Sequence, residues 1–193
     1  MFTAAPTARA DLKAGALYAF FGEGGWIYYG QVTAEKKVAF FRCRDRELGD
    51  SEAVLATPVM CLLSVAYPSI TRALRSGRWT KLGRHPLSSQ LQKPQPSVNW
   101  PVGTLTVTVC IGDSTYDTRV DDPAIQDMEL MAVWDAEAHV PARLTADFGV
   151  EPAQWHVGGP IRRERRIKEE MAQRFPDQPW HQLPGDWVPT SVR

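Results

Sequence analysis

The densest hydrophobic pattern in the chain runs from Gly15 to Arg44. Eight of the nineteen aromatic residues fall between Tyr18 and Phe41, and polar breaks at residues 22–25 and 33–36 divide the stretch into three short runs. The runs are rich in aromatic and β-branched side chains, which favour extended backbone. The pattern therefore predicts a three-stranded antiparallel meander.

The middle run of this meander has no polar face. In an extended strand, the even-numbered residues 26–32 point to one side and the odd-numbered residues 27–31 to the other. Both sets contain large apolar side chains. The predicted sheet must therefore be covered on both sides or curled, and Gly30 in mid-strand predicts a bend or bulge that helps it curl.

Further strands and helices are predicted after the meander from the period of the apolar residues and from flanking Pro and Gly. The expected strands are an apolar stretch at 54–65 with Pro58 at an edge or bulge, then 79–83, 104–110, 115–120 and 128–134. The expected helices are 68–74, a start at 121–123, 140–148, and a basic helix that follows Gly159-Pro160 and ends before Pro176.

We expect a single domain with five parts. They are a loose lead-in at 1–12, the aromatic-rich β meander half at 13–84, a proline-rich crossing at 85–101, an α+β half at 102–175, and a Pro/Trp tail at 176–193 laid over the body. The predicted fold class is α+β, with a curled antiparallel sheet or partial β-barrel and short flanking helices.

The overall charge of the chain is balanced, but two stretches carry a local excess of one sign. The 193 residues are 44% hydrophobic, with 22 basic and 22 acidic side chains, so the whole chain offers no argument for binding nucleic acid or an anionic membrane. No membrane-length apolar run and no secretory signal are visible, so a cytoplasmic protein is expected. Residues 72–93 are basic, whereas residues 113–137 hold eight acidic side chains against Arg119 alone.

The cysteine and histidine spacings give no reason to expect a metal or another cofactor. Cys43, Cys61 and Cys110 lie far apart in apolar runs, which predicts three buried, reduced thiols. The four histidines lie apart from one another and from any cysteine pair, unlike the ligands of a zinc site.

Three segments invite a chemical interpretation. Gly112-Asp113-Ser114 follows a strand, as a nucleophilic serine does in GDS-type esterases, but a D-x-x-H partner is missing and a polar hairpin turn explains the same residues. The glycine-rich residues 22–25 precede a strand and not a helix, which favours a turn over a phosphate loop. Glutamates interleave with the basic helix at 162–166, which is typical of a solvated helix face.

Short motifs of glycine and aromatic residues mark the first half of the chain. They are Gly15-x-Leu17-Tyr18-Ala19-Phe20, Gly25, Tyr29-Gly30-Gln31-Val32 and Gly77-Arg78-Trp79-x-x-Leu82-Gly83. In these motifs, over about residues 15 to 85, the chain resembles the immunity protein 26 family of bacterial polymorphic toxin systems. The resemblance implies a small cytoplasmic protein, encoded beside a toxin in systems of interbacterial competition, that binds and neutralises that toxin.

The leading hypothesis is thus a non-catalytic immunity protein that occludes the active face of a cognate toxin. Many intracellular toxins are nucleases with basic substrate sites, so the acidic stretch is the predicted contact, through Asp113, Asp117, Asp121, Asp122, Asp127 and Glu129. An alternative is a ligand- or peptide-binding β-barrel module whose groove is lined by Trp26, Tyr28 and Trp79. A hydrolase that uses Ser114 is the third hypothesis.

Overall fold

The computed structural model describes residues 1–155 and 157–190, and the chain forms two compact units. Unit 1 comprises Met1–Pro94 and Ala132–Val157, and unit 2 comprises Gln95–Met131 and Gly158–Arg193. The chain first leaves unit 1 inside the proline-rich segment that was predicted as a crossing. The chain returns to unit 1 at Ala132–Val157 and then completes unit 2.

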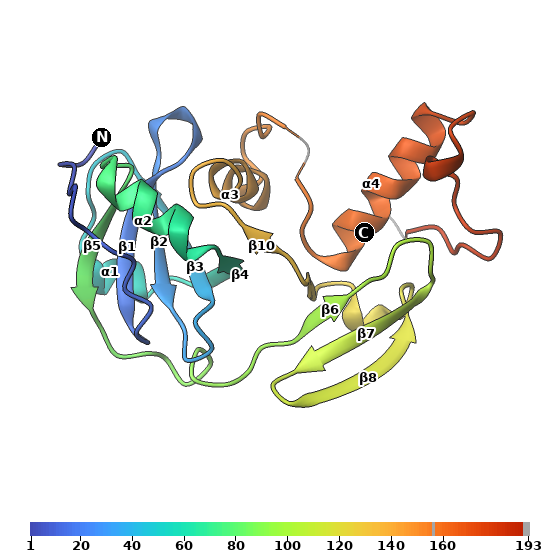
Figure 1. The fold of residues 1–193 in the computed structure, drawn as a ribbon, viewed down its shortest axis with the longest axis horizontal. Coiled ribbons are helices and arrows are strands. Elements are labelled where there is room, and N and C mark those ends of the chain that lie inside the picture. The colour runs from blue at the N-terminus through green and yellow to red at the C-terminus, as the bar shows by residue number, and fades with distance from the viewer. Residues whose placement is uncertain (156, 191–193) are drawn as a thin grey trace. The chain divides into compact units, whose positions relative to one another are not determined.

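Unit 1 is built on a six-stranded sheet whose strand order is β10-β4-β3-β2-β1-β5 (Figure 1). All neighbours are antiparallel except β10 and β4, which are parallel. The strands are β1 (Ala16–Phe21), β2 (Ile27–Val32), β3 (Val38–Asp45), β4 (Val59–Val65), β5 (Trp79–Arg84) and β10 (Val133–Trp134). The meander predicted for the first three strands is confirmed.

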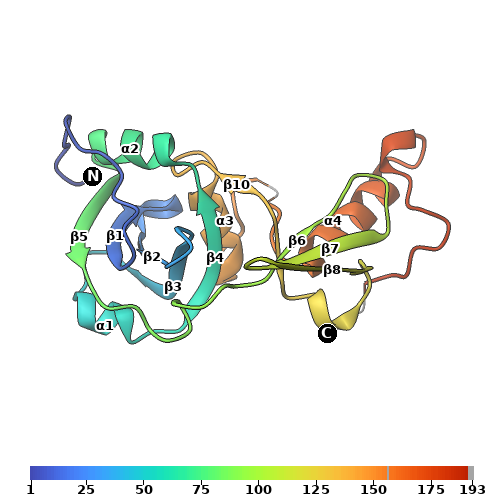
Figure 2. The same ribbon diagram turned by 60° about the horizontal axis from the view of Figure 1, so that its bottom comes forward.

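The sheet curls, as predicted from a middle strand without a polar face (Figure 2). The β2–β3 register shifts between Tyr28 and Gly30, so the expected bulge is present. A Cβ atom at residue 30 would lie 2.7 Å from a methyl group of Val38 and 3.0 Å from the ring of Phe40. Glycine is therefore required here because the neighbouring strand packs against the backbone itself.

Both faces of the curled sheet are covered. Tyr18, Phe20, Tyr28 and Phe40 point into one core, and Leu17 and Tyr29 are among the residues of a second core on the opposite face. The first core is closed by α2 (Tyr67–Arg75) and α3 (Val140–Phe148), and the second by α1 (Ser51–Leu55). Figure 2 shows α1 and α2 on opposite sides of the sheet.

The helices of unit 1 follow local capping signals. Pro68 lies in the first turn of α2, and Gly149 ends α3 in a left-handed conformation with φ of +73°. The stretch expected as one strand from residue 54 instead begins with α1, because the Asp50 carboxylate accepts a hydrogen bond from the Ala53 N–H at 2.9 Å and caps a helix there.

Unit 2 contains a four-stranded sheet in the order β8-β7-β6-β9, with a core around Val98, Val109 and Ile161. Its elements are β6 (Ser97–Asn99), β7 (Thr106–Ile111), β8 (Ser114–Arg119), the short helix η2 (Pro123–Ile125), β9 (Glu129–Leu130), α4 (Ile161–Arg174) and the short helix η3 (Pro179–His181). With a curled half-barrel sheet, a second sheet and flanking helices, the fold is α+β. Within residues 1–155 and 157–190, no helix is long and apolar enough to cross a membrane.

The strand predicted at residues 128–134 is divided between two sheets. β9 pairs in parallel with β6 in unit 2, whereas β10 pairs in parallel with β4 in unit 1. An apolar run shows that a segment is buried but not in which core, so the sequence pattern could not show this division.

The lead-in predicted as loose is held against unit 1. The Phe2 N–H donates to the Gly77 carbonyl at 2.9 Å, and the Phe2 ring lies 4.5 Å from that of Phe21. The Asp11 N–H donates to the Tyr18 hydroxyl, which in turn donates to the Asp11 carbonyl, both at 2.8 Å. Burial raises the pKa of Tyr18 to about 12, so this hydroxyl keeps its proton at neutral pH.

The Asp11 side chain makes this anchoring dependent on pH. A hydrogen bond from Lys81 lowers the pKa of Asp11 to about 2, despite some burial. Since an unfolded Asp titrates near 3.9, the stabilisation is present above about pH 4 and is lost as the pH falls toward 2. We expect Asp11→Asn to reduce the change in the free energy of unfolding between pH 4 and pH 2 by about 1 kcal/mol or less. The effect is small because the Asp11–Lys81 ion pair is partly exposed and therefore screened by solvent. Urea unfolding from pH 5 to 2 measures it, and an unchanged profile would contradict the assignment.

Candidate functional site

An open aromatic groove of about 440 Å³ lies within unit 2. One wall is α4, and the others are the loop at 101–104 and the tail at 179–187. Its lining is mainly apolar with a few polar groups, which is the composition of a binding pocket. The main lining side chains are Trp100, Ile167, Met171, Leu183 and Trp187, with Glu164, Lys168 and His181 as the charged and polar members.

Two tryptophans of the groove are held in place by hydrogen bonds. The rings of Trp100 and Trp187 lie 6.1 Å apart at an interplanar angle of 19°. The Trp100 indole donates to the Thr104 carbonyl, and the Trp187 indole donates to Glu169, both at 2.9 Å. Because both indole N–H groups are satisfied inside the unit, the ring positions exist before any partner arrives.

The rim of the groove exposes large apolar groups to solvent. Trp180 is 75% exposed and Val102 is 96% exposed. The Lys168 ammonium lies 4.9 Å from the centre of the Trp100 ring and adds a cation at the edge. Exposed tryptophan beside a preformed apolar groove is a feature of many interaction sites, since tryptophan is one of the residues that dominate binding energy at interfaces.

The six carboxylates predicted as a contact all lie in unit 2, but most have internal roles. Asp121 bonds to Arg119 at 3.0 Å, and Asp127 pairs with Arg162. Asp122 caps η2, and hydrogen bonds from the Thr118 hydroxyl and the Ala124 N–H lower its pKa. Glu129 is half-buried in β9.

Two of the six carboxylates remain on the surface without an ion pair among the described residues. Asp113 is exposed at the turn between β7 and β8, and Asp117 is exposed on β8, where it accepts a hydrogen bond from Thr108 at 2.7 Å. These two are the members of the set best placed to face a partner. Whether any of the six contacts one stays a prediction.

The groove predicted from Trp26, Tyr28 and Trp79 does not form as expected. Tyr28 is 0% and Trp79 is 1% exposed, so both are core residues. Trp26 lines a small cavity of about 250 Å³ whose lining includes neither Tyr28 nor Trp79. The prediction failed because aromatic strand residues that suit a groove equally suit a core.

Trp26 belongs to an arginine–aromatic stack that ties β3 to the end of α3. The guanidinium of Arg46 lies 3.5 Å from the Trp26 ring centre, and that of Arg44 lies between Trp26 at 4.1 Å and Phe148 at 4.3 Å. Glu151 pairs with Arg44, which lowers the pKa of this glutamate. Because Arg44 is paired with Glu151 and packed between two rings, we assign the stack to the scaffold.

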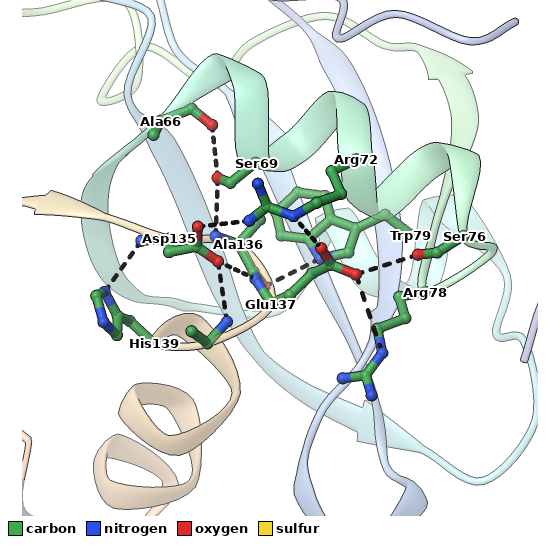
Figure 3. Close-up of polar contacts among 11 residues, drawn as sticks. Ala66, Ser69, Arg72, Ser76, Arg78, Trp79, Asp135, Ala136, Glu137 and His139 are labelled. Atoms are coloured by element: carbon green, nitrogen blue, oxygen red, sulfur yellow. Dashed lines mark hydrogen bonds and ion pairs between the residues drawn. The ribbon is translucent and has the colours of Figure 1, made fainter. Parts of the chain in front are cut away.

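The densest polar cluster in unit 1 is centred on Arg72 of α2 (Figure 3). Arg72 donates to Asp135 and Glu137, both at 2.7 Å. Asp135 also accepts the backbone N–H groups of Glu137 and Ala138 at 2.9 and 3.0 Å. Burial alone would raise the pKa of Asp135, but these N–H groups and Arg72 outweigh it and the pKa is lowered.

The remaining contacts of this cluster join backbone to side chain. Ser69 accepts the Ala136 N–H at 2.9 Å and donates to the Ala66 carbonyl at 2.6 Å, and the Trp79 indole donates to the Ala136 carbonyl at 3.3 Å (Figure 3). These hydrogen bonds hold the segment after β10 against α2 and β5. The cluster therefore holds the returning chain in unit 1.

The other predicted chemical groups occupy ordinary positions. Ser114 is exposed at the start of β8, after a two-residue loop in which Gly112 has φ of +56°. All three cysteines are free, but only Cys61 is buried, while Cys43 and Cys110 are half-buried. The expectation of three buried thiols was therefore wrong for two of them, because each lies toward the end of a strand where cover is thinner.

No protein-family model, curated protein or solved structure matches this chain.

Two segments of the groove were predicted from the sequence, but their meeting was not. The last helix was expected after Gly159-Pro160, and the tail at 176–193 was expected to lie over the body. No signal linked either of them to Trp100, which lies more than sixty residues earlier. Only the folded chain brings these three segments together.

Proposed function

We propose that this protein is an immunity protein, which binds a cognate bacterial toxin without catalysis and covers its active face. The family resemblance in the first half of the chain supports this proposal. The observation that carries it is the preformed tryptophan groove of unit 2, which gives the protein a site suited to holding a partner protein.

The motif residues behind the resemblance are framework residues. Gly15 has φ of +89°, and a Cβ atom there would lie 2.3 Å from the His85 carbonyl oxygen. Tyr18 and Trp79 are buried in the first core. Because buried residues cannot touch a partner, the partner site belongs on other residues, and the groove is the strongest candidate.

The occupant we assign to the groove is an apolar side chain, or a pair of them, from the folded toxin. Trp100 and Trp187 provide rigid walls, and Trp180 adds a largely exposed ring that would be buried on binding. Burying an exposed aromatic in a fixed apolar site typically contributes 2 kcal/mol or more to an interface, by the order of magnitude seen at hot spots. Exposed Asp113 and Asp117 would add electrostatic steering toward a basic toxin.

The test uses the toxin encoded directly beside this gene. We expect Trp180→Ala to weaken binding of the purified toxin domain at least about tenfold and to reduce protection when the two are co-expressed, because a rim hot spot is lost. Calorimetric titration and growth rescue measure these effects. Trp155→Ala, which removes another exposed tryptophan but in unit 1, serves as the matched control and should leave both readouts unchanged.

Two outcomes count against the proposal. If the wild-type chain neither binds that toxin nor protects cells from it, the immunity function is wrong. If it protects and Trp180→Ala protects equally well at matched affinity, the groove is not the contact site.

A second candidate function is a peptide-binding module, because an aromatic groove open to solvent also suits an extended peptide. The two functions differ in whether the toxin must be folded in order to bind. A peptide-binding module would bind unfolded fragments of the toxin about as well as the folded domain, whereas an immunity protein would bind the folded domain alone.

A further inference from the structure

The strand β8 is an unpaired sheet edge. It is the terminal strand of its sheet, and nearly all of its residues are exposed. Its sequence, STYDTR, contains no proline, and its ladder with β7 has no bulge, so its protection is limited to the charged side chains of Asp117 and Arg119. Among the described residues no strand pairs with its free side, so its outer backbone groups, apart from the Arg119 carbonyl, are available to another strand.

The residues with outward backbone groups can be identified from the ladder. The Val120 N–H donates to the Leu105 carbonyl at 2.8 Å, so residue 120 is in a hydrogen-bonded pair with β7. Such pairs alternate along an antiparallel ladder. The even residues of β8 therefore bond to β7, and the odd residues Thr115, Asp117 and Arg119 direct their N–H and C=O groups outward. Of these groups, the Arg119 C=O already accepts the Asp122 N–H at 3.0 Å.

We propose that β8 pairs antiparallel with β8 of a second copy of this chain, about a two-fold axis at Tyr116. The two four-stranded sheets would then join into one continuous sheet. This self-association goes beyond the function proposed above. It does not involve the tryptophan groove, although it uses Asp113 and Asp117, the carboxylates proposed to steer the toxin.

Charge selects this register. In the joint sheet, residues with outward backbone groups must lie opposite one another. Two positions of the two-fold axis satisfy this condition and pair five of the six residues of β8: an axis at Tyr116 pairs residues 114–118, and an axis at Asp117 pairs residues 115–119. An axis at Asp117 would set the two Asp117 carboxylates directly opposite each other, which is destabilising. The axis at Tyr116 instead sets Asp117 opposite Thr115 and Asp113 opposite Arg119, twice each.

The side chains are free to make these contacts. Asp113 is exposed, Tyr116 is 47% exposed, and the Arg119 side chain is 47% exposed. Arg119 already donates to Asp121 and Asp186 with three of its five N–H groups, which leaves two for the second copy. A single shared edge is a small interface, so we expect a weak dimer with Kd on the order of 10 to 100 μM.

Site-directed cross-linking tests the register. Residue 116 faces its own copy across the axis in a non-hydrogen-bonded pair, where Cα atoms lie about 4.5 Å apart, a separation that a disulfide can span. Tyr116→Cys should therefore cross-link under mild oxidation at 100 μM and run as a dimer on non-reducing gels. Ser114→Cys is the matched control, because its copies would be separated by four strand positions, and wild-type protein measures the background from the native thiols.

A charge swap tests the predicted pairs. Asp113→Arg and Arg119→Asp should each weaken the dimer at least tenfold in sedimentation equilibrium, and the double variant should restore the Kd to within about threefold of wild type. A monomer at 200 μM, equal cross-linking of the two cysteine variants, or a double variant as weak as the single ones would each overturn the proposal. Melting curves establish that every variant is folded, and no toxin is needed, so failure here is distinct from failure of the immunity function.

Discussion

Trp79→Ala should lower the free energy of unfolding of unit 1 by about 3 to 5 kcal/mol, the usual cost of removing a large buried aromatic. Trp79 is 1% exposed, and its ring stacks on Phe20 at 4.5 Å and lies 5.7 Å from Tyr18. Its indole also donates to the Ala136 carbonyl, so truncation removes a contact to the returning segment as well as leaving a cavity. Urea unfolding followed by circular dichroism measures the loss.

Trp155→Ala is the matched control for this experiment. Trp155 lies in the same unit but is 42% exposed, with its ring 5.7 Å from that of His139. Its removal should cost less than about 1 kcal/mol, as for other surface substitutions. A Trp79→Ala variant as stable as the control would mean that Trp79 is not a core residue, and the aromatic groove of the barrel-module hypothesis would regain support.

Gly77→Ala should destabilise unit 1 by about 2 to 5 kcal/mol, the sum of a left-handed backbone penalty and a steric clash. Gly77 has φ of +75°, and a Cβ atom there would lie 2.4 Å from the Phe2 carbonyl oxygen. Backbone cannot move aside as a flexible side chain can. The substitution should therefore also displace the lead-in from β5, which amide hydrogen exchange of residues 2–11 would detect.

Gly149→Ala separates the two contributions to this effect. Gly149 lies in the same unit with nearly the same φ, +73°, but a Cβ atom there would meet no atom within 4 Å. Its substitution should cost only the backbone penalty, about 1 to 2 kcal/mol. Equal losses at the two positions would show that the lead-in is not packed against Gly77.

The elements that sequence analysis predicted well are those with local causes. The meander followed from three short runs of aromatic and β-branched residues between polar breaks, and α3 followed from a proline in its first turn and Gly149 after its last. These signals act over a few residues, so they are readable without knowledge of the rest of the fold. Where a local signal was overlooked, as with the Asp50 cap of α1, the prediction erred.

Whether an aromatic side chain is buried or exposed was less predictable than whether its segment forms a helix or a strand. Tyr28 and Trp79 were considered as groove residues and lie in the core, whereas Trp180, in a tail expected to lie over the body, is largely exposed. An aromatic side chain is compatible with either environment. Which one it meets depends on the segments that pack around it, and the sequence pattern does not specify them.

The α+β class, the curl of the first sheet, its bulge at Gly30 and the helices with clear caps could all be predicted from local sequence patterns. Three features could not: which core receives each half of the 128–134 stretch, which carboxylates are paired, and how Trp100, α4 and the tail form one groove. Propensity and capping act between near neighbours, whereas a groove and an ion pair depend on contacts between residues tens of positions apart.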